Sequence, residues 1–180
     1  NFNGEKMSKS RGNVVDPYIL SQRFGVDALR FFLLRTFPFG SDGNFTNEML
    51  ISTINVDLAN VLGNLVSRTV AMTQKYFGER LPAEQLEDPE KDSELIAMAY
   101  SLRGRYEAAM ESYAFQNALG EVFKVLDRAN KYIDENAPWV LAKSEENKPR
   151  LARVLYNLLE TVRICGGLLS PFMPDTAAEI

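Results

Sequence analysis

The stretch TNEMLISTINVDLANVLGNLVSRTVAMTQKY, residues 46–76, decides the fold class. Thr46 is a residue type that caps helix N-termini, and apolar side chains follow it at the three- and four-residue spacing of one helix face. These apolar residues are Leu50, Ile54, Leu58, Val61, Leu65 and Met72. The spacing predicts a long helix that runs from Thr46 to about Tyr76.

Helical patterns continue on both sides of this stretch. Downstream, we predict helices over residues 95–113, 115–135 and 148–169, a short helical turn opened by Pro138, and a further helix after Pro174. Upstream, a loop over residues 1–15 precedes two short helices, 18–24 and 27–36. No stretch shows the sustained alternation of a strand. The prediction is an all-α fold, with a mostly helical segment over residues 1–45 and a helical bundle over residues 46–180.

Composition excludes several classes of site. The 180 residues include one cysteine and no histidine, so a disulfide framework, the usual zinc ligand sets and a Ser-His-Asp triad are all excluded. We therefore predict no metal site. No apolar run near 18 residues stands out and the N-terminus lacks the apolar core of a signal peptide, so we predict no membrane span and a cytoplasmic protein.

Charge is distributed unevenly along the chain. Residues 1–40 carry six Lys or Arg and three Asp or Glu, whereas the whole chain has a net charge of −4. A basic front end on an acidic body argues against nucleic-acid binding over the whole surface. It permits a local phosphate site near the N-terminus.

The loop KMSKS, Lys6 to Ser10, has the chemistry for such a site. It places two ammonium groups and two hydroxyls in five residues, with Gly4 and Gly12 as hinges on either side. Lysines that meet a departing pyrophosphate stabilise charge as it develops in the transition state. The alternative from composition alone is an ordinary basic surface loop.

The longer string KMSKSRGNVVDP resembles the second signature of class I aminoacyl-tRNA synthetases, the loop that completes their ATP site. The resemblance implies that Lys9 is the main catalytic phosphate contact and that Lys6 assists it, with Ser8 and Ser10 also in the ATP site. Leucyl, isoleucyl, valyl and cysteinyl enzymes share much of this string, so it indicates a class and leaves the amino acid open.

Three further segments are similar to methionyl-tRNA synthetases: residues 24–46 (FGVDALRFFLLRTFPFGSDGNFT), 60–69 (NVLGNLVSRT) and 136–143 (NAPWVLAK). The resemblance implies a stem-contact segment followed by an anticodon-binding bundle, in an enzyme that uses ATP, Mg²⁺, methionine and tRNA(Met). The Rossmann-type catalytic domain of that family is absent, and both ends of the chain look cut. We expect a fragment that is catalytically incomplete by itself.

The RNA-reading residues are predicted from two places in the chain. Asn64 and Arg68 are four apart and share a helix face, and Trp139 follows a proline at a helix start. Asn, Arg and Trp side chains suit the edges and faces of unstacked bases. The family resemblance implies that these three read the CAU anticodon, which requires the long helix and segment 136–143 to lie together. Without the resemblance, a solvated polar strip and a core tryptophan are the alternatives.

Weaker candidates complete the prediction. Asp27 and Arg30 could pair or face the tRNA stem, Asp57, Asn60 and Ser67 extend the polar strip of Asn64, and Lys124, Arg128 and Lys131 form a basic strip for tRNA phosphates or a solvated face. Cys165 is expected to be buried. The alternative functions are a leucyl, isoleucyl or valyl enzyme and a non-catalytic RNA-binding helical module.

Overall fold

The structure is a computed structural model that describes residues 1–180. It is built from helices, and the only β-pairing is a pair of isolated bridges from Phe2 to Glu5 and to Phe45, so the all-α prediction is confirmed. The α-helices are α1 (Pro17–Phe24), α2 (Val26–Thr36), α3 (Asn47–Thr53), α4 (Asn64–Phe77), α5 (Pro89–Glu111), α6 (Phe115–Asn136), α7 (Pro138–Leu141), α8 (Lys148–Leu169) and α9 (Pro174–Glu179). Two 3₁₀ turns, η1 (Lys9–Arg11) and η3 (Glu145–Asn147), and the π-helical η2 (Ile54–Gly63) join them.

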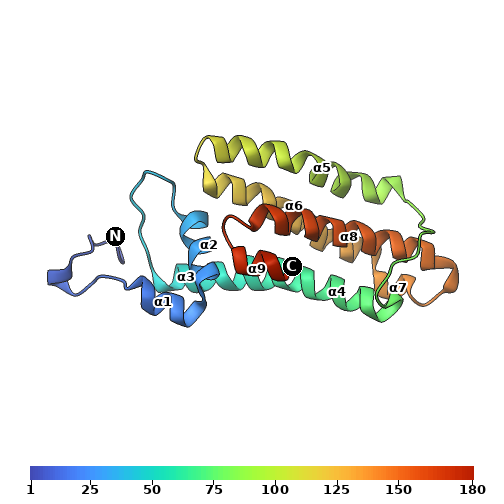
Figure 1. Ribbon diagram of the computed structural model, residues 1–180, viewed down its shortest axis with the longest axis horizontal. Helices are drawn as coiled ribbons and strands as arrows, with labels where there is room; N and C mark the ends of the chain where they lie inside the picture. Colours follow the sequence, from blue (N-terminus) through green and yellow to red (C-terminus); the bar gives the residue numbers. More distant parts are fainter.

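The long helices run along the longest axis of the molecule, with α5 on one side, α3–η2–α4 on the other, and α6 and α8 between them (Figure 1). Five apolar positions at helical spacing on α6 are fully buried: Ala118, Val122, Val125, Leu126 and Ala129. Helix α6 contacts α2, η2, α4, α5, α7 and α8. The bundle core is therefore organised around this one helix.

The helix predicted from residue 46 forms as α3, η2 and α4 without interruption, and the Thr46 hydroxyl accepts a hydrogen bond from the backbone N–H of Met49. Its middle is π-helical: the Asn64 N–H donates to the carbonyl of Ala59, five residues back. Leu62 is buried although it was not among the predicted apolar positions. It lies four residues after Leu58 and three before Leu65, on the same helix face. Asn64 is the first residue after this segment.

The prediction that no segment is long and apolar enough to span a membrane is wrong for this helix. Asn47–Phe77 contains an 18-residue window of mean hydropathy 1.4, which by length and composition is enough to cross a membrane, and 17% of that window is buried. Core helices of globular bundles also pass this test. In the structure the helix packs against α2, α6 and α8.

The N-terminal segment has a small core of its own, formed by Phe32, Phe45 and Leu50. Polar contacts join this segment to the C-terminal turn of the bundle. The Asp27 carboxylate accepts from the Thr176 N–H at 2.7 Å, and the Arg30 guanidinium donates to the carbonyls of residues 171 and 172. The suggested Asp27–Arg30 ion pair does not form, because each side chain reaches across to the α8–α9 turn instead.

Helix α5 begins earlier than the predicted residue 95. Asp88 is the N-cap, its carboxylate accepts from the Lys91 N–H, and Pro89 occupies the first helical position. The acidic, proline-containing stretch read as a connection up to residue 94 thus contains the first turn of a helix. This earlier start brings Asp92 into the bundle.

Asp92 belongs to a buried polar cluster, defined here as Asp92, Tyr132, Asn136, Arg150 and Asn157, which joins α5, α6 and α8. The Arg150 guanidinium donates to both oxygens of Asp92, at 2.7 and 2.6 Å, and to Oδ1 of Asn136 at 2.6 Å. The Tyr132 hydroxyl donates to Asp92 at 2.6 Å and accepts from Asn157 at 3.0 Å. A two-pronged pair of this kind is geometrically specific.

Burial alone would raise the pKa of the Asp92 carboxyl, but hydrogen bonds from Arg150 and Tyr132 outweigh burial and hold the pKa below its ordinary value of 3.8. The unfolded chain therefore binds more protons than the folded chain in this pH range. The contribution of Asp92 to the free energy of unfolding is complete above pH 3.8 and is lost as the pH falls toward the lower folded pKa.

We predict that the double variant Asp92→Leu/Arg150→Met loses less stability between pH 5 and pH 2.5 than the wild type, because it lacks the depressed carboxyl. Its free energy of unfolding at pH 7 should be within about 1–4 kcal/mol of the wild-type value, whereas Arg150→Met alone should lose about 3–5 kcal/mol because Asp92 remains buried and unpaired. Urea titrations at each pH measure both effects. Parallel pH profiles for wild type and double variant would contradict the assignment.

Candidate functional site

The loop from Lys6 to Ser10 lies at one end of the molecule, ahead of α1 (Figure 1). Met7 packs against the small N-terminal core, while Lys6 and Lys9 are exposed and form no ion pair. The Ser8 and Ser10 hydroxyls are 2.8 Å apart and hydrogen-bond each other. The methionine thus anchors the loop, and both ammonium groups are free for an anion.

Asn13 organises this loop, and sequence reasoning missed it. Its side-chain oxygen accepts from the Ser8 N–H at 2.8 Å and its amide donates to the Lys6 carbonyl at 3.2 Å. Gly12, at φ +68°, turns the chain back so that the Asn13 side chain can reach the backbone of Lys6 and Ser8. The Gly-Asn pair after the lysines was the available signal, since both residue types favour such turns.

Trp139 lies at the opposite end of the long axis, in α7 (Figure 1). Pro138 is buried, whereas the tryptophan is 44% exposed, so the indole does not fill the core. Ala137 before them has φ +43° and ψ +66°, an uncommon conformation for a residue with a side chain. The turn is closed by the Val140 N–H, which donates to the Ala137 carbonyl at 2.7 Å.

Arg68 and Asn64 lie on the helix that borders the C-terminal end of α6. Asn64 is exposed, and the Arg68 guanidinium contacts the Asp134 carboxylate at 3.3 Å. One helical turn before Asp134, the Asn130 amide donates to the Val61 carbonyl at 3.1 Å. Helix α7 starts only four residues after Asp134, so the structure brings the two predicted parts of the RNA site to one end of α6.

The other residues of the predicted polar strip, Asp57, Asn60 and Ser67, do not make contacts at this end of α6. Asp57 accepts from the Arg35 Nε at 3.1 Å, which ties η2 to α2. Burial and the nearby Asp57 charge raise the pKa of Asp127, while Arg35 opposes them. Asn60 is exposed, whereas Ser67 borders a cavity on another side of the helix. Of the strip, Arg68 is the residue whose side chain contacts α6, at Asp134.

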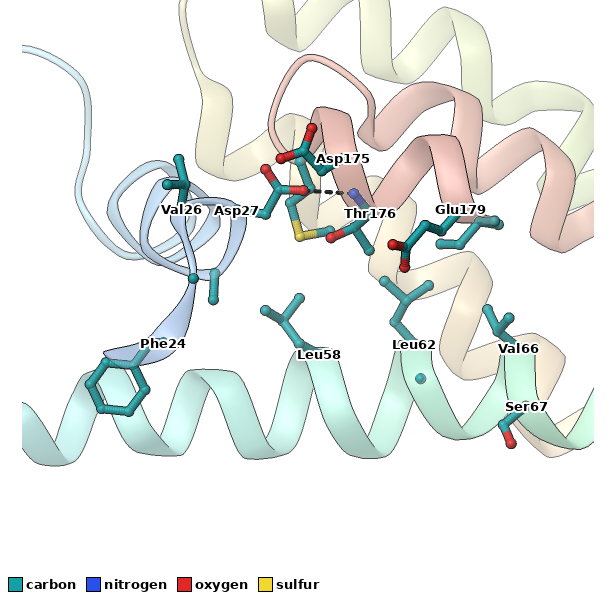
Figure 2. Close-up of a pocket in the computed structure, with 15 residues that line it drawn as sticks. Phe24, Val26, Asp27, Leu58, Leu62, Val66, Ser67, Asp175, Thr176 and Glu179 are labelled. Atoms are coloured by element: carbon teal, nitrogen blue, oxygen red, sulfur yellow. Dashed lines mark hydrogen bonds between the residues drawn. The ribbon is translucent and has the colours of Figure 1, made fainter. Parts of the chain in front are cut away.

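That cavity has a volume of about 510 Å³ and lies between α2, the long helix and α9 (Figure 2). Phe24, Leu58 and Leu62 make part of its wall. One oxygen of Asp27 bonds the Thr176 N–H, and its other oxygen is buried without a partner. None of the predicted nucleotide-site or anticodon-site residues lines this cavity, so it is separate from both.

The predicted basic strip on α6 is divided, because Arg128 is buried whereas Lys124 and Lys131 lie on a solvated face. Arg128 is 8% exposed and is paired with Glu94 at 2.6 Å and Glu135 at 2.9 Å. Lys124 and Lys131 pair with acidic neighbours on their own helix. Arg103 and Arg105 are likewise paired. Of these cations only Arg128 is buried, whereas Arg103, Lys124 and Lys131 are 80%, 64% and 70% exposed in pairs at the surface.

Most of the 20 Lys and Arg side chains have such a partner, and those without one fall into two groups. The cations without an ion pair are Lys6, Lys9, Arg11, Arg23 and Arg30 in the N-terminal segment, and Lys75, Arg80 and Lys143 near the far ends of α4 and α7. Free positive charge thus gathers at the loop end and at the Trp139 end of the molecule. Both ends suit phosphate groups.

Comparison with known proteins identifies the class first. Residues 1–70 match the family described as tRNA synthetases class I (M), and residues 82–180 match the anticodon binding domain of methionyl tRNA ligase. These matches show that the chain belongs to the class I aminoacyl-tRNA synthetases. Within that class, the chain belongs to the methionyl-tRNA ligase family, and the matches do not support the leucyl, isoleucyl or valyl alternatives.

Individual proteins similar to this chain are members of the same family. The chain is 57% identical to the methionine–tRNA ligase of Caldanaerobacter subterraneus subsp. tengcongensis and 53% identical to that of Clostridium perfringens, each over 98% of this chain. It spans only 28% and 27% of those two proteins. Among solved structures, Mycobacterium tuberculosis methionyl-tRNA synthetase in complex with methionyl-adenylate has a TM-score of 0.93 at 42% identity, over 99% of this chain and 36% of that one.

We predict that Asn13→Ala loosens the nucleotide loop without unfolding the protein. Removing one hydrogen-bond acceptor should destabilise the local closed state by about 1 kcal/mol, which speeds hydrogen exchange of the Ser8 amide about fivefold. Asn44→Ala is the matched control, because that asparagine accepts from the Gly4 N–H instead. If hydrogen exchange of the Ser8 amide is unchanged in Asn13→Ala, the Asn13 hydrogen bonds do not stabilise the closed loop.

Proposed function

We propose that this chain forms the nucleotide loop and the tRNA-reading bundle of a methionine–tRNA ligase, which joins methionine to tRNA(Met) through a methionyl-adenylate made from ATP. Residues 1–45 supply the loop and a stem-contact segment, and residues 46–180 supply the anticodon-binding bundle. The proposed compartment is the cytoplasm. Family membership supports the activity, and the chain by itself is proposed to be catalytically incomplete because it matches under a third of its relatives.

The observation that carries the proposal is the exposed Trp139 in its rigid turn, beside the helix that bears Asn64 and Arg68. An indole held in this way offers a flat face for a splayed base, and stacking of this kind contributes about 1–3 kcal/mol per base. The Asn64 amide and the Arg68 guanidinium supply hydrogen bonds to base edges. We propose that these three side chains read the CAU anticodon.

Arg68 is held loosely enough to serve this role. Its contact with Asp134 is a single 3.3 Å approach between partners that are 34% and 69% exposed. Exposed pairs of this kind contribute only about 0–1 kcal/mol. A base that offers the guanidinium two acceptors or a flat face can therefore replace the carboxylate at little cost. Nearby, the unpaired Lys75, Arg80 and Lys143 would meet phosphates of the same RNA.

The loop's role follows from its charge and its exposure. ATP supplies the adenylyl group that activates methionine, and pyrophosphate departs with negative charge that needs stabilising. Lys9, assisted by Lys6, would hold that charge, and the Ser8 and Ser10 hydroxyls would donate to phosphate oxygens. Residues 1–15 do not fit a magnesium site, because Glu5 is their only carboxylate and the structure holds no cluster of three acidic ligands.

We predict that Trp139→Ala in the full-length ligase raises the Kd for tRNA(Met) about tenfold or more, since one base loses its stacking partner. Methionine-dependent ATP–pyrophosphate exchange should stay at the wild-type rate, because α7 lies at the far end from the loop. Trp139→Phe is the matched variant and should retain most of the affinity. Equal tRNA affinity in all three proteins would remove Trp139 from the site.

We predict that Lys9→Ala in the full-length ligase impairs adenylate formation and not tRNA binding, the reverse of Trp139→Ala. Adenylate formation should slow by about 10²-fold or more, as for loss of one donor to a developing charge, while the Kd for tRNA(Met) stays within about twofold. Pre-steady-state formation of methionyl-adenylate measures the first quantity. Arg23→Ala, which removes another unpaired cation of this segment, should leave that rate unchanged. Normal adenylate formation in Lys9→Ala would contradict the catalytic role.

A further inference from the structure

We infer that Asn136 is a positioning residue for RNA recognition: Arg150, itself clamped by Asp92, holds the Asn136 side chain and so sets the turn that presents Trp139. The RNA role of Trp139 rests on the proposed function, but the positioning itself does not. Asn136 is the last residue of α6, and only Ala137 and Pro138 separate it from the indole.

The geometry of Asn136 leaves its side chain one orientation. Its Oδ1 accepts from Arg150 Nη2 at 2.6 Å, and its Nδ2 donates to the Tyr132 carbonyl at 2.9 Å. The residue is 6% exposed, so water does not compete for either bond. The donor is equally fixed, because Asp92 binds the same guanidinium with both of its oxygens. The C-terminus of α6 is thus tied to α5 and α8 at one point.

The strained backbone of Ala137, the residue after Asn136, indicates that the Arg150–Asn136 contact is needed to hold the turn. Ala137 is left-handed at φ +43°, a conformation that residues with a Cβ avoid and that persists only where the surroundings over-determine it. On the far side of Ala137, buried Pro138 has its φ restricted by its ring. The strained residue therefore lies between two fixed points, one of which is the Asn136 side chain.

Stability alone does not account for the buried cluster. Buried ion pairs are often no more stabilising than apolar side chains of similar volume, and the neighbouring positions of α6 and α8 are filled in that way by Leu126, Ile133, Leu151 and Leu155. A hydrogen-bonded cluster also fixes orientation, because the Arg150 guanidinium, which donates to five oxygens, accepts only one arrangement of its partners. Here the cluster fixes the orientation of the C-terminal end of α6, which precedes the exposed indole of Trp139.

A preset indole raises affinity by reducing the freedom that RNA binding must remove. Immobilising one side chain and its turn on binding weakens association by a few-fold. We therefore expect loss of the Asn136 contact to leave the fold intact, to free the indole, and to raise the Kd for tRNA about fivefold.

The test uses full-length ligase labelled with fluorotryptophan, in which the ¹⁹F resonance of Trp139 is assigned by its loss in Trp139→Phe. In Asn136→Ala, this resonance should move and narrow as the indole gains freedom, and the Kd for tRNA(Met) should rise about fivefold, with unchanged adenylate formation. Asn136→Asp keeps the oxygen that Arg150 contacts but sets its second oxygen against the Tyr132 carbonyl, so it should restore both values only in part. Asn157→Ala is the matched control, since this equally buried asparagine bonds only the Tyr132 hydroxyl in the cluster.

An unchanged Trp139 resonance in Asn136→Ala would overturn the inference. If Asn136→Ala does not fold, Asp92→Leu/Arg150→Met removes the donor instead and must move the same resonance. A resonance that moves in Asn157→Ala as much as in Asn136→Ala would also overturn it, because the effect would then be general loosening of the core. If the resonance moves as expected while Trp139→Ala leaves tRNA affinity unchanged, the positioning holds and the anticodon role of Trp139 fails.

Discussion

Burial of α6 is the constraint on which the rest of the structure depends. Its apolar face lies at the centre of the main core, and every long helix packs against it (Figure 1). Phe31 of α2 packs on Phe123 of α6, with ring centres 5.3 Å apart, which joins the N-terminal segment to the bundle. At the other end of α6, Asn130 and Asp134 contact the long helix. One buried helix therefore sets where both candidate sites lie.

Ion pairing then decides which charges remain for a partner. A chain with a net charge of −4 can still bind a polyanion if its acids neutralise some cations and leave others free. Here Glu121, Glu94 and Glu135 neutralise the cations of the central helices, so the middle of the bundle has little free positive charge. The cations left without partners lie at the two ends, which is where the nucleotide loop and the exposed tryptophan are found.

Much of the fold could be predicted from the sequence, because helix starts and apolar stripes are local signals. The helix starts at Thr46 and Pro138 were both placed correctly for this reason. The start of α5 was missed, because Asp88-Pro89 reads equally well as an acidic connection or as a cap with a first-turn proline. The π segment was also missed, since i→i+5 bonding has no residue signature and shows only in the backbone hydrogen bonds.

The sequence by itself determined the chemistry of the two candidate sites: lysines and serines in one loop, and an asparagine, an arginine and a proline-fixed tryptophan farther along. Residue type and local spacing are enough for that. Only the tertiary structure decided which side chains are free to act, because partners arrive from distant elements. It paired Arg68 with Asp134, and it brought the Arg150 guanidinium within hydrogen-bond distance of the Asn136 side chain. Contacts of that kind depend on how helices pack, and no local pattern encodes them.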